Sequence, residues 1–459
     1  MVIGLLGMLI VPFNIFIGLG IGAMLVVIAS VASALTLLPA ILSLAGDNIN
    51  RLKIPWVGGS DSDPEQVHGF WDSVSSKVMK WPIVSLVLAG GLLIIATVPA
   101  FDMHTGFAGV STLPEAVAAK EGFVILVREF SAGNVTPAQI VIQGDIDSLQ
   151  PAIQDLTKAL KDDPPGAFGD PMPLEVSDDG TVALFSVPVM GDSAEDVAVD
   201  AIKRLREVYV PRAFDSISGV SVAVTGETAY NIDFFDSAAN AAKFVFPFVL
   251  GMSFIFLLVV FRSMVVPVVA IVLNLLSVGA TYGILVLAFQ KGWGENLGVL
   301  SQFDIIEAWI PLFLCSILFG LSMDYHVFLL SRIRERYDLT QDNAGSVAFG
   351  IRTTGRLITG AAVIMVAVFW AFSAGDIIGL QQMGFGLGVA ILIDATIVRM
   401  VLVPASMKLL GDHNWYLPAM LNWMPDLRVE AEARSQWRNP QTSSICALEA
   451  DSRRMEGVT

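Results

Sequence analysis

Long apolar stretches alternate with polar segments along the chain, and they predict membrane-spanning helices. A helix that crosses the hydrocarbon core of a bilayer needs about 20 predominantly apolar residues. Residues 1–11 are apolar but too short to span, and are the expected end of a helix that a longer protein would complete. Seven further stretches are long enough, namely 16–45, 82–101, 244–261, 265–289, 309–331, 357–374 and 379–407, of which the last two are divided by Gly375 and Asp376.

The composition agrees with a membrane protein and excludes a string of ordinary soluble domains. Hydrophobic residues make up 54% and charged residues 15% of the 459 residues, whereas soluble domains carry about 25% charged residues. The net charge is −16, and residues 102–242 hold 22 acidic against 8 basic residues. This acidic balance disfavours nucleic acid as a partner. The two cysteines, Cys315 and Cys446, predict no disulfide framework.

Basic residues near the span ends predict the orientation, because cytoplasmic loops carry an excess of Lys and Arg. Every second loop is basic, and the Lys and Arg residues concerned are Arg51, Lys53, Lys77, Lys80, Arg262, Arg332, Arg334, Arg336, Arg352, Arg356, Lys408, Arg428, Arg434 and Arg438. A first part, 1–45, is therefore expected to lead into a cytoplasmic linker, 46–81, and the span 82–101. The acidic block, 102–243, is placed outside the cytoplasm, and a five-helix bundle, 244–407, is followed by a cytoplasmic tail, 408–459.

The acidic block has the pattern of alternating strands and helices. Strands are predicted at 139–143, 174–176, 182–187 and 220–224, and helices near 148–161 and 194–209. Asp179-Gly180 is the strongest hairpin-turn signal in the block. The order βαββαβ is that of the split βαβ, ferredoxin-like unit. The expected fold class is thus a polytopic α-helical membrane protein with an extracytoplasmic α+β domain.

The first and last full spans share a sequence pattern. Glycines 18, 20 and 22 precede Leu-Pro-Ala at 38–40 and Gly-Asp at 46–47, while glycines 384, 386 and 388 precede Val-Pro-Ala at 403–405 and Gly-Asp at 411–412. Small residues let membrane helices approach closely, so packing is the favoured role of these glycines. The recurrence also predicts duplicated halves, of which the first is cut short.

Ionisable residues inside the predicted spans are the candidates for chemistry, because each costs about 2.5–3.5 kcal/mol at the bilayer centre on insertion scales. They are Asp324, about 15 residues into its span, and Asp394 and Arg399 in the final span. A medium of low dielectric disfavours the charged form of a carboxylate, so Asp324 is a candidate to bind and release a proton as its access to water changes. A polar clamp between helices, without titration, is an equally weighted interpretation of Asp324.

Neighbouring polar residues extend this set. Tyr325 is a donor for a carboxylate across the bundle, since adjacent helix positions do not face each other. His326 is favoured as an interhelical hydrogen-bond partner over a proton-relay residue, and Ser322 lies nearby. Asp394 and Arg399 are five residues apart and are not expected on one helical stripe. Arg399 is therefore expected to pair with a carboxylate of another helix, and Asp394 to join such a pair or to handle protons.

Several motifs are absent from the sequence. It contains no GxxxxGK[ST] phosphate loop, no HExxH or Cys-His cluster for a metal, and no GxSxG nucleophile elbow. No cofactor, metal site or enzyme activity is therefore expected, and an ion gradient or a partner would have to power any work. Asn274 and Ser277 are interpreted as packing residues.

Five segments carry a resemblance to a known family. GLSMDYHVFLLSRIRER resembles the signature of the tenth of twelve helices in the MMPL (mycobacterial membrane protein large) family of RND-superfamily transporters. GVSTLPEAVAAKEGFVILVREFSAG and VTGETAYNIDFFD are similar to the two ends of the family's second porter domain. FRSMVVPVVAIVLNLLSVGATYGILVLAFQKG is similar to the eighth-to-ninth helix region, and MGFGLGVAILIDATIVRMVLVPASMKLLGDHNWYLP to the last helix and its tail. The chain resembles the C-terminal half of such a transporter, from about helix five onward.

The resemblance implies export of lipids or other hydrophobic compounds across the bacterial inner membrane, driven by the proton motive force. In such transporters an Asp-Tyr pair on the fourth helix faces another on the tenth, and Asp324 with Tyr325 matches the tenth-helix pair. The implied partners are the cargo, membrane lipids, and the missing N-terminal half or another transporter chain. We expect residues 1–459 to derive from a longer exporter, through a truncated gene or a start-site error, and to need the missing half for activity.

Two alternatives from other classes stay open. One is a non-transporting membrane subunit or scaffold whose outer domain binds a partner, and the other is an inactive truncated fragment. Under the scaffold alternative, Asp324→Asn leaves function intact while lesions in 102–242 abolish it. A protein-translocation accessory of the same superfamily fits the quoted segments less well.

Overall fold

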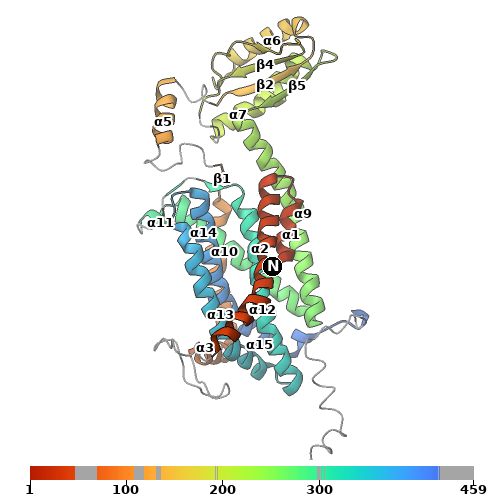
Figure 1. The fold of residues 1–459 in the computed structure, drawn as a ribbon, viewed down its shortest axis with the longest axis vertical. Helices are drawn as coiled ribbons and strands as arrows, with labels where there is room; N and C mark the ends of the chain where they lie inside the picture. Colours follow the sequence, from red (N-terminus) through yellow and green to blue (C-terminus); the bar gives the residue numbers. More distant parts are fainter. Residues whose placement is uncertain are drawn as a thin grey trace, which may run out of the picture.

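The computed structural model describes residues 1–46, 70–107, 118–130, 136–191, 193, 195–296, 300, 302–303, 305–421 and 423. They form an elongated molecule with a small α+β domain at one end and a long bundle of helices beneath it (Figure 1). Most of the predicted cytoplasmic linker, the tail beyond 423 and Cys446 lie outside the described residues.

The prediction of seven spans is confirmed, since seven of the described helices are long and apolar enough to cross a membrane. Four of them are single α-helices: α2 (Asn14–Ala45), α9 (Glu227–Phe261), α12 (Ile310–Thr340) and α13 (Asn343–Ser373). The other three change their winding along the way: α4 (Pro82–Thr97) continues into η3 (Val98–Asp102), α10 (Val265–Leu285) into η7 (Val286–Gln290), and α14 (Ile378–Ile393) into η8 (Asp394–Leu402), α15 (Val403–Leu410) and η9 (Gly411–Trp415).

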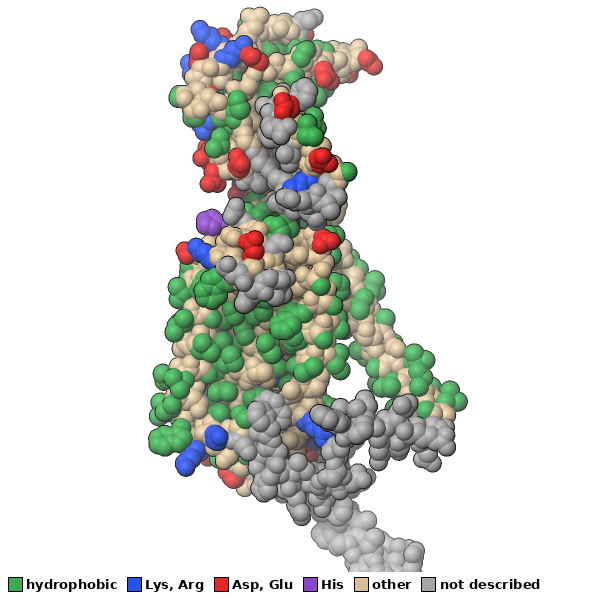
Figure 2. Space-filling view, turned by 90° about the vertical axis from the view of Figure 1, so that its left-hand side faces the viewer, with side chains coloured by type: hydrophobic (Ala, Val, Ile, Leu, Met, Phe, Trp, Pro, Cys, Tyr) green, Lys and Arg blue, Asp and Glu red, His purple; other side chains and the backbone are tan. Residues whose placement is uncertain are grey.

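Shorter elements complete the membrane part. The first turns, α1 (Val2–Leu6) and η1 (Gly7–Ile10), pack on α12 and α9, and α3 (Phe70–Lys80) packs on α13. Strand β1 (Thr105–Gly106) pairs in parallel with β6 (Ile306–Glu307). Helices α11 (Trp293–Asn296) and η10 (Ala419–Leu421) are also short, and α5 (Ala118–Phe130) lies on the side of the outer domain (Figure 1). Figure 2 shows apolar side chains along the sides of the bundle and Lys and Arg gathered at its lower end.

The outer domain follows the predicted chain order βαββαβ. Its elements are β2 (Ala138–Gln143), α6 (Ile146–Lys161), β3 (Glu175–Val176), β4 (Val182–Val187), α7 (Asp196–Arg204) with η6 (Leu205–Tyr209) and α8 (Val210–Phe214), and β5 (Ser221–Thr225). The strands pair antiparallel in the order β3-β4-β2-β5. Alternate residues of β2, including Ile140 and Ile142, are buried in the domain core. This alternation is typical of an antiparallel sheet with one covered face.

The hairpin predicted at Asp179-Gly180 is confirmed. Gly180 has a φ of +68°, in the left-handed region that glycine adopts at low cost. The backbone N–H of Ser177 donates to the carbonyl of Val182 at 2.8 Å, which closes the loop between β3 and β4. The Asp179 carboxylate accepts hydrogen bonds from Ser177 Oγ and Thr181 N.

Helix α9 joins the outer domain to the bundle without a break (Figure 1). Its 35 residues correspond to about 52 Å at 1.5 Å per residue. The boundary expected at 243/244 therefore lies inside a helix, because hydrophobicity marks where the chain enters the membrane and not where the helix begins. At the junction, the ring of Phe234 lies 4.6 Å from that of Phe13 and 4.7 Å from that of Phe107.

The two copies of the glycine pattern pack differently. A Cβ atom at Gly388 would lie 2.3 Å from Trp370 Nε1, and one at Gly384 would lie 2.5 Å from the carbonyl of Phe369. These two glycines therefore allow α14 to lie close against α13, as small residues do in membrane helices. On α2, a Cβ atom at Gly18 or Gly22 would meet no described atom within 4 Å. The packing role is thus confirmed for the second copy, and the described residues supply no neighbour for these two glycines of the first.

Candidate functional site

A cluster of buried polar side chains lies between α10, α12 and η8. Asn274 comes from α10, Ser322 from α12, and Asp394 and Arg399 from η8. Arg399 is fully buried, and the other three are each at least nine-tenths buried. Because buried charges persist only when they are paired and hydrogen-bonded, the contacts within this cluster define what the site can do.

The segment η8 is a π-helix, and this winding brings Asp394 and Arg399 together. Arg399 Nε lies 3.0 Å and Nη2 lies 2.6 Å from Asp394 Oδ2. In an α-helix, residues five apart point to different sides, but the i to i+5 hydrogen bonds of a π-helix align them. The expectation that Arg399 pairs with a carboxylate of another helix is therefore wrong, because it assumed regular α-helical winding.

Ser322 connects this ion pair to α10. Its Oγ lies 2.9 Å from Asp394 Oδ1 and 2.5 Å from Asn274 Oδ1. Arg399 Nη2 donates to both the backbone carbonyl and the hydroxyl of Ser322. Three separate segments of the chain are thereby held together at the centre of the bundle.

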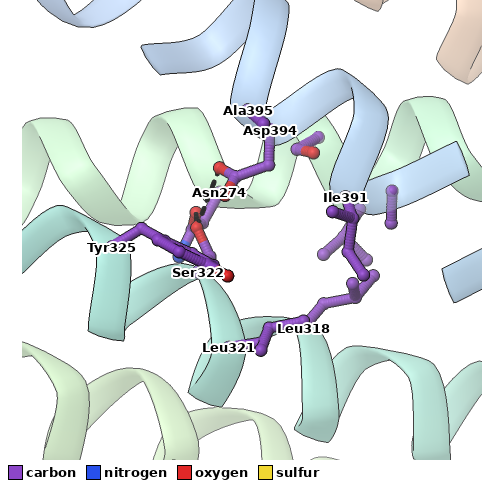
Figure 3. Close-up of a pocket in the computed structure, with 11 residues that line it drawn as sticks. Asn274, Leu318, Leu321, Ser322, Tyr325, Ile391, Asp394 and Ala395 are labelled. Carbon is purple, nitrogen blue, oxygen red and sulfur yellow. Dashed lines mark hydrogen bonds between the residues drawn. The ribbon is translucent and has the colours of Figure 1, made fainter. Parts of the chain in front are cut away.

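A small cavity adjoins the cluster. Its volume is about 20 Å³, which exceeds the 10–15 Å³ that one water molecule needs. The polar side chains on its wall include Asn274, Ser322, Tyr325 and Asp394 (Figure 3). Ser277 is a further polar residue of the wall, and apolar residues of α10, α12, α14 and η8 form the remainder. The site therefore combines an ion pair, a hydroxyl, an amide and space for a single small polar molecule.

Asp324 and Tyr325 lie on different sides of α12. The Asp324 side chain is 56% exposed among the described residues, and its Oδ1 lies 3.2 Å from the amino group of Met1. Tyr325 turns into the bundle, where the Arg399 guanidinium carbon lies 5.1 Å from the centre of its ring, within the range of a cation–π contact. The Tyr325 hydroxyl donates to Met365 Sδ at 3.3 Å. The structure thus does not join Asp324 to Tyr325 or to the buried cluster.

His326 is also buried inside the bundle. Only 1% of it is exposed, and its Nδ1 has no hydrogen-bond partner among the described residues. The hydrogen bond to another helix that was expected for His326 is therefore not made through this nitrogen. His326 does not border the cavity.

Sequence reasoning missed two features of the site. Asn274 was interpreted as a packing residue, yet it accepts a hydrogen bond from Ser322 and borders the cavity. The signal was a single amide in an otherwise apolar stretch, since buried polar groups need partners. The π-helical winding of η8 was also missed. The signal was the presence of two opposite charges, Asp394 and Arg399, in one otherwise apolar span, because buried charges need to be paired.

Comparisons with known proteins match nearly the whole chain. A model of the MMPL family matches residues 1–85 and 112–442. The mycolic acid-containing lipids exporter MmpL11 of Mycolicibacterium smegmatis is 32% identical over 91% of this chain and 44% of that protein. The heme uptake protein MmpL11 of Mycobacterium tuberculosis is 32% identical over 87% of this chain and 41% of that protein. The trehalose monomycolate exporter MmpL3 of Mycolicibacterium smegmatis is 29% identical over 93% of this chain and 43% of that protein. The chain thus spans less than half the length of these three relatives.

Proposed function

Since the chain belongs to the MMPL family, we propose that it acts as the C-terminal portion of a proton-driven exporter of lipids or other hydrophobic compounds. The chain is a multi-pass protein of the inner membrane, with seven described helices able to span it. Two of its relatives are named as exporters of mycolic acid-containing lipids and of trehalose monomycolate. A further relative is named for heme uptake, so the proposed cargo class includes hydrophobic compounds other than lipids. In this role the chain is a transporter and not an enzyme.

The observation that carries the proposal is a carboxylate in the middle of a spanning helix. Asp324 is the fifteenth residue of α12, about 21 Å from the start of that helix. The described residues leave more than half of its side chain uncovered. A charge at this depth is costly unless it is paired or can be neutralised, and the partner that Asp324 has among the described residues is the amino group of Met1. Proton binding at Asp324 is therefore a means of changing the energy of the bundle. Tyr325 completes the pair that the family resemblance assigns to proton relay.

Contacts of α12 provide a route from Asp324 to the outer domain. Helix α12 packs against α9, and α9 continues into the outer domain as one helix. In the proposed cycle, protonation of Asp324 lets α12 shift against its neighbours, and α9 carries this movement outward. The remainder of the transporter, or another chain, covers the face that bears Asp324 and supplies the opposing Asp-Tyr pair.

The proposed orientation places 102–243 outside the cytoplasm and the tail inside. Support comes from the Lys and Arg residues at the lower end of the bundle (Figure 2), opposite the outer domain. Cytoplasmic ends of membrane helices are enriched in these residues. The outer domain is then positioned to receive cargo that leaves the membrane.

The test is Asp324→Asn in the complete transporter, with lipid export measured in vesicles under an imposed proton gradient. Asparagine keeps the size of the side chain but cannot bind and release a proton, so export should be lost while the amount of protein in the membrane is unchanged. Asp376→Asn makes the same change in the loop between α13 and α14 and should leave export intact. Undiminished export by the Asp324 variant would contradict the proposal and would favour a scaffold role.

A further inference from the structure

Ser322 lies between two acceptor oxygens but carries only one hydrogen. Its Oγ is within hydrogen-bond distance of both Asn274 Oδ1 and Asp394 Oδ1. A serine hydroxyl donates one hydrogen bond, so it serves one of these oxygens at a time. Its lone pairs are already approached by Arg399 Nη2 at 3.1 Å. In this orientation of the Asn274 amide, one of the two oxygens therefore needs a second donor.

Asn274 has an amide nitrogen that no described group uses. Nδ2 of Asn274 is buried and has no hydrogen-bond partner among the described residues, and the residue is only 2% exposed. A buried N–H left without a partner destabilises the folded state. Exchanging the amide nitrogen and oxygen would leave an unpaired acceptor in the same place, so a partner is needed in either orientation.

The residues that carry the unused amide nitrogen and the under-served oxygens all border the cavity. Asn274, Ser322 and Asp394 all border it, and Figure 3 shows their side chains converging at one end. The volume of about 20 Å³ is enough for one water molecule. Arg399, paired with Asp394 beside the cavity, disfavours a cation there. A water molecule is the ligand that fits the size, the charge and the available donors and acceptors.

We propose that this cavity binds one water molecule, held by Asn274 Nδ2 as donor and by Asp394 Oδ1 as acceptor. Ser322 then gives its hydrogen to Asn274 Oδ1, and Arg399 donates to Ser322 and Asp394. With the water in place, Asn274 Oδ1, Asn274 Nδ2 and Asp394 Oδ1 each have a hydrogen-bond partner. Asn274 is thus a positioning residue for the water and not packing material.

A bound water gives Asp394 a neighbour that can exchange hydrogen ions. Its part in proton movement rests on the proposed function, because only a proton-driven exporter needs such an exchange in the bundle. The binding of the water itself does not depend on transport. The two statements can therefore be tested separately, one on the protein at rest and one during export.

The test is water-edited solid-state NMR on the uniformly labelled full chain in lipid bilayers. This experiment measures how fast magnetisation from water protons reaches each assigned site. Transfer to Asn274 Nδ2 and to the Asp394 carboxyl carbon should be several-fold faster than transfer to Gln382 Nε2. Gln382 is the matched reference, because its buried amide is hydrogen-bonded at both ends, to Ile305 O and Glu307 N. Transfer to Asn274 as slow as that to Gln382 would overturn the water site.

Two variants separate the water from general loosening of the bundle. Asn274→Leu keeps a similar side-chain volume but cannot hold the water, so the fast transfer to Asp394 should be lost. Thr281→Val removes a buried hydroxyl on the same helix that donates to Ser277 O and does not border the cavity, so the fast transfer should remain. Fast transfer to Asp394 that persists in the Asn274 variant would contradict the proposal. If the wild type shows fast transfer but no proton-driven export, the proposed function would be contradicted. The water site would still be supported by the fast transfer.

Discussion

Two buried carboxylates of this molecule have partners near a π-helical segment. One carboxylate, Asp163, lies in the outer domain, and the other, Asp394, lies in the membrane part. In the outer domain, Arg204, the last residue of α7, and Tyr209, the last residue of η6, are five residues apart and both contact Asp163. In the membrane, η8 places Arg399 beside Asp394, also five residues apart. The same local winding therefore serves both regions, but the surroundings differ.

The outer carboxylate is fully satisfied by donors. Asp163 accepts hydrogen bonds from Tyr209 Oη at 2.6 Å, from Ala167 N at 3.0 Å, and from Arg204 Nε and Nη2 at 3.3 Å each. Burial by itself raises the pKa of Asp163, but these hydrogen bonds, with the charge of Arg204, outweigh it and hold the pKa below its ordinary value. Asp163 thus links the loop before Ala167 to the helical residues Arg204 and Tyr209, and its role is structural.

The membrane carboxylate belongs to a cluster that is not closed. Nη1 of Arg399 and Nδ2 of Asn274 find no partner among the described residues, and a cavity lies beside the cluster. A closed polar cluster makes a structure rigid, while one with unused donors can take up a ligand or rearrange. The comparison indicates that the outer site stabilises the fold and that the membrane site is suited to exchange.

The largest effect on stability is expected for Arg399→Met. This change leaves the Asp394 carboxylate buried without its partner, which costs about 3–5 kcal/mol for a buried ion pair. The free energy of unfolding in mixed micelles, followed by circular dichroism, measures the loss. The double variant Asp394→Leu with Arg399→Met should recover most of it, because replacing both charges by apolar groups is often nearly neutral. A single variant as stable as the wild type would show that the pair is not buried as described.

A smaller loss is expected for Asp163→Asn in the outer domain. After the change, the four donors that bind the Asp163 carboxylate face a neutral amide oxygen. The fold is less stable as a result, because hydrogen bonds to charged groups contribute about 1.5–3 kcal/mol and those to neutral groups contribute less. The loss is limited because the Arg204 side chain is 30% exposed and can turn to water. Hydrogen exchange of the amides in 136–225 measures the effect. Asp170→Asn, which removes an exposed ion pair with Lys161, is the control and should change exchange little. Equal effects of the two variants would contradict the role given to Asp163.

The smallest effect is expected for Tyr209→Phe, which removes one of these donors at a cost of about 1 kcal/mol. Because the pKa of Asp163 is lowered by folding, its stabilisation is present above the unfolded pKa of about 3.9 and is lost as pH falls through the folded pKa. The stability difference between wild type and variant should therefore shrink in acid. The test is to monitor unfolding by hydrogen exchange, once at neutral pH and once below the unfolded pKa of the aspartate. A stability difference between wild type and variant that does not change with pH would contradict this prediction.

The hydrophobic pattern alone was enough to predict the spans and the order of strands and helices in the outer domain. Each span is one long apolar stretch, and the strands of the domain alternate between buried and exposed positions, for example along β2. Boundaries were less certain, since α9 begins at Glu227, well before its apolar part. A hydrophobic pattern records the environment of a residue and not the start of a helix.

The geometry of the candidate site could not be predicted in the same way. Placing Asp394 and Arg399 relative to each other requires knowing the local winding, and the residue pattern of η8 does not distinguish a π-helix from an α-helix. Likewise, the contacts of Asn274 with Ser322 depend on how α10 crosses α12. The sequence identified Asp394, Arg399 and Ser322 as candidates, because polar residues in a spanning helix stand out, but it did not show which of them meet.

The most direct test of proton-driven transport is the charge of Asp324 during the cycle. Carbon-13 NMR of labelled aspartate carboxyls in the complete transporter, reconstituted in vesicles, can be recorded with and without a proton gradient. We expect the Asp324 signal to move between its protonated and ionised positions as the gradient is applied, while the Asp163 signal stays at the ionised position. An Asp324 signal that keeps one charge state throughout would contradict a proton-driven mechanism at this residue.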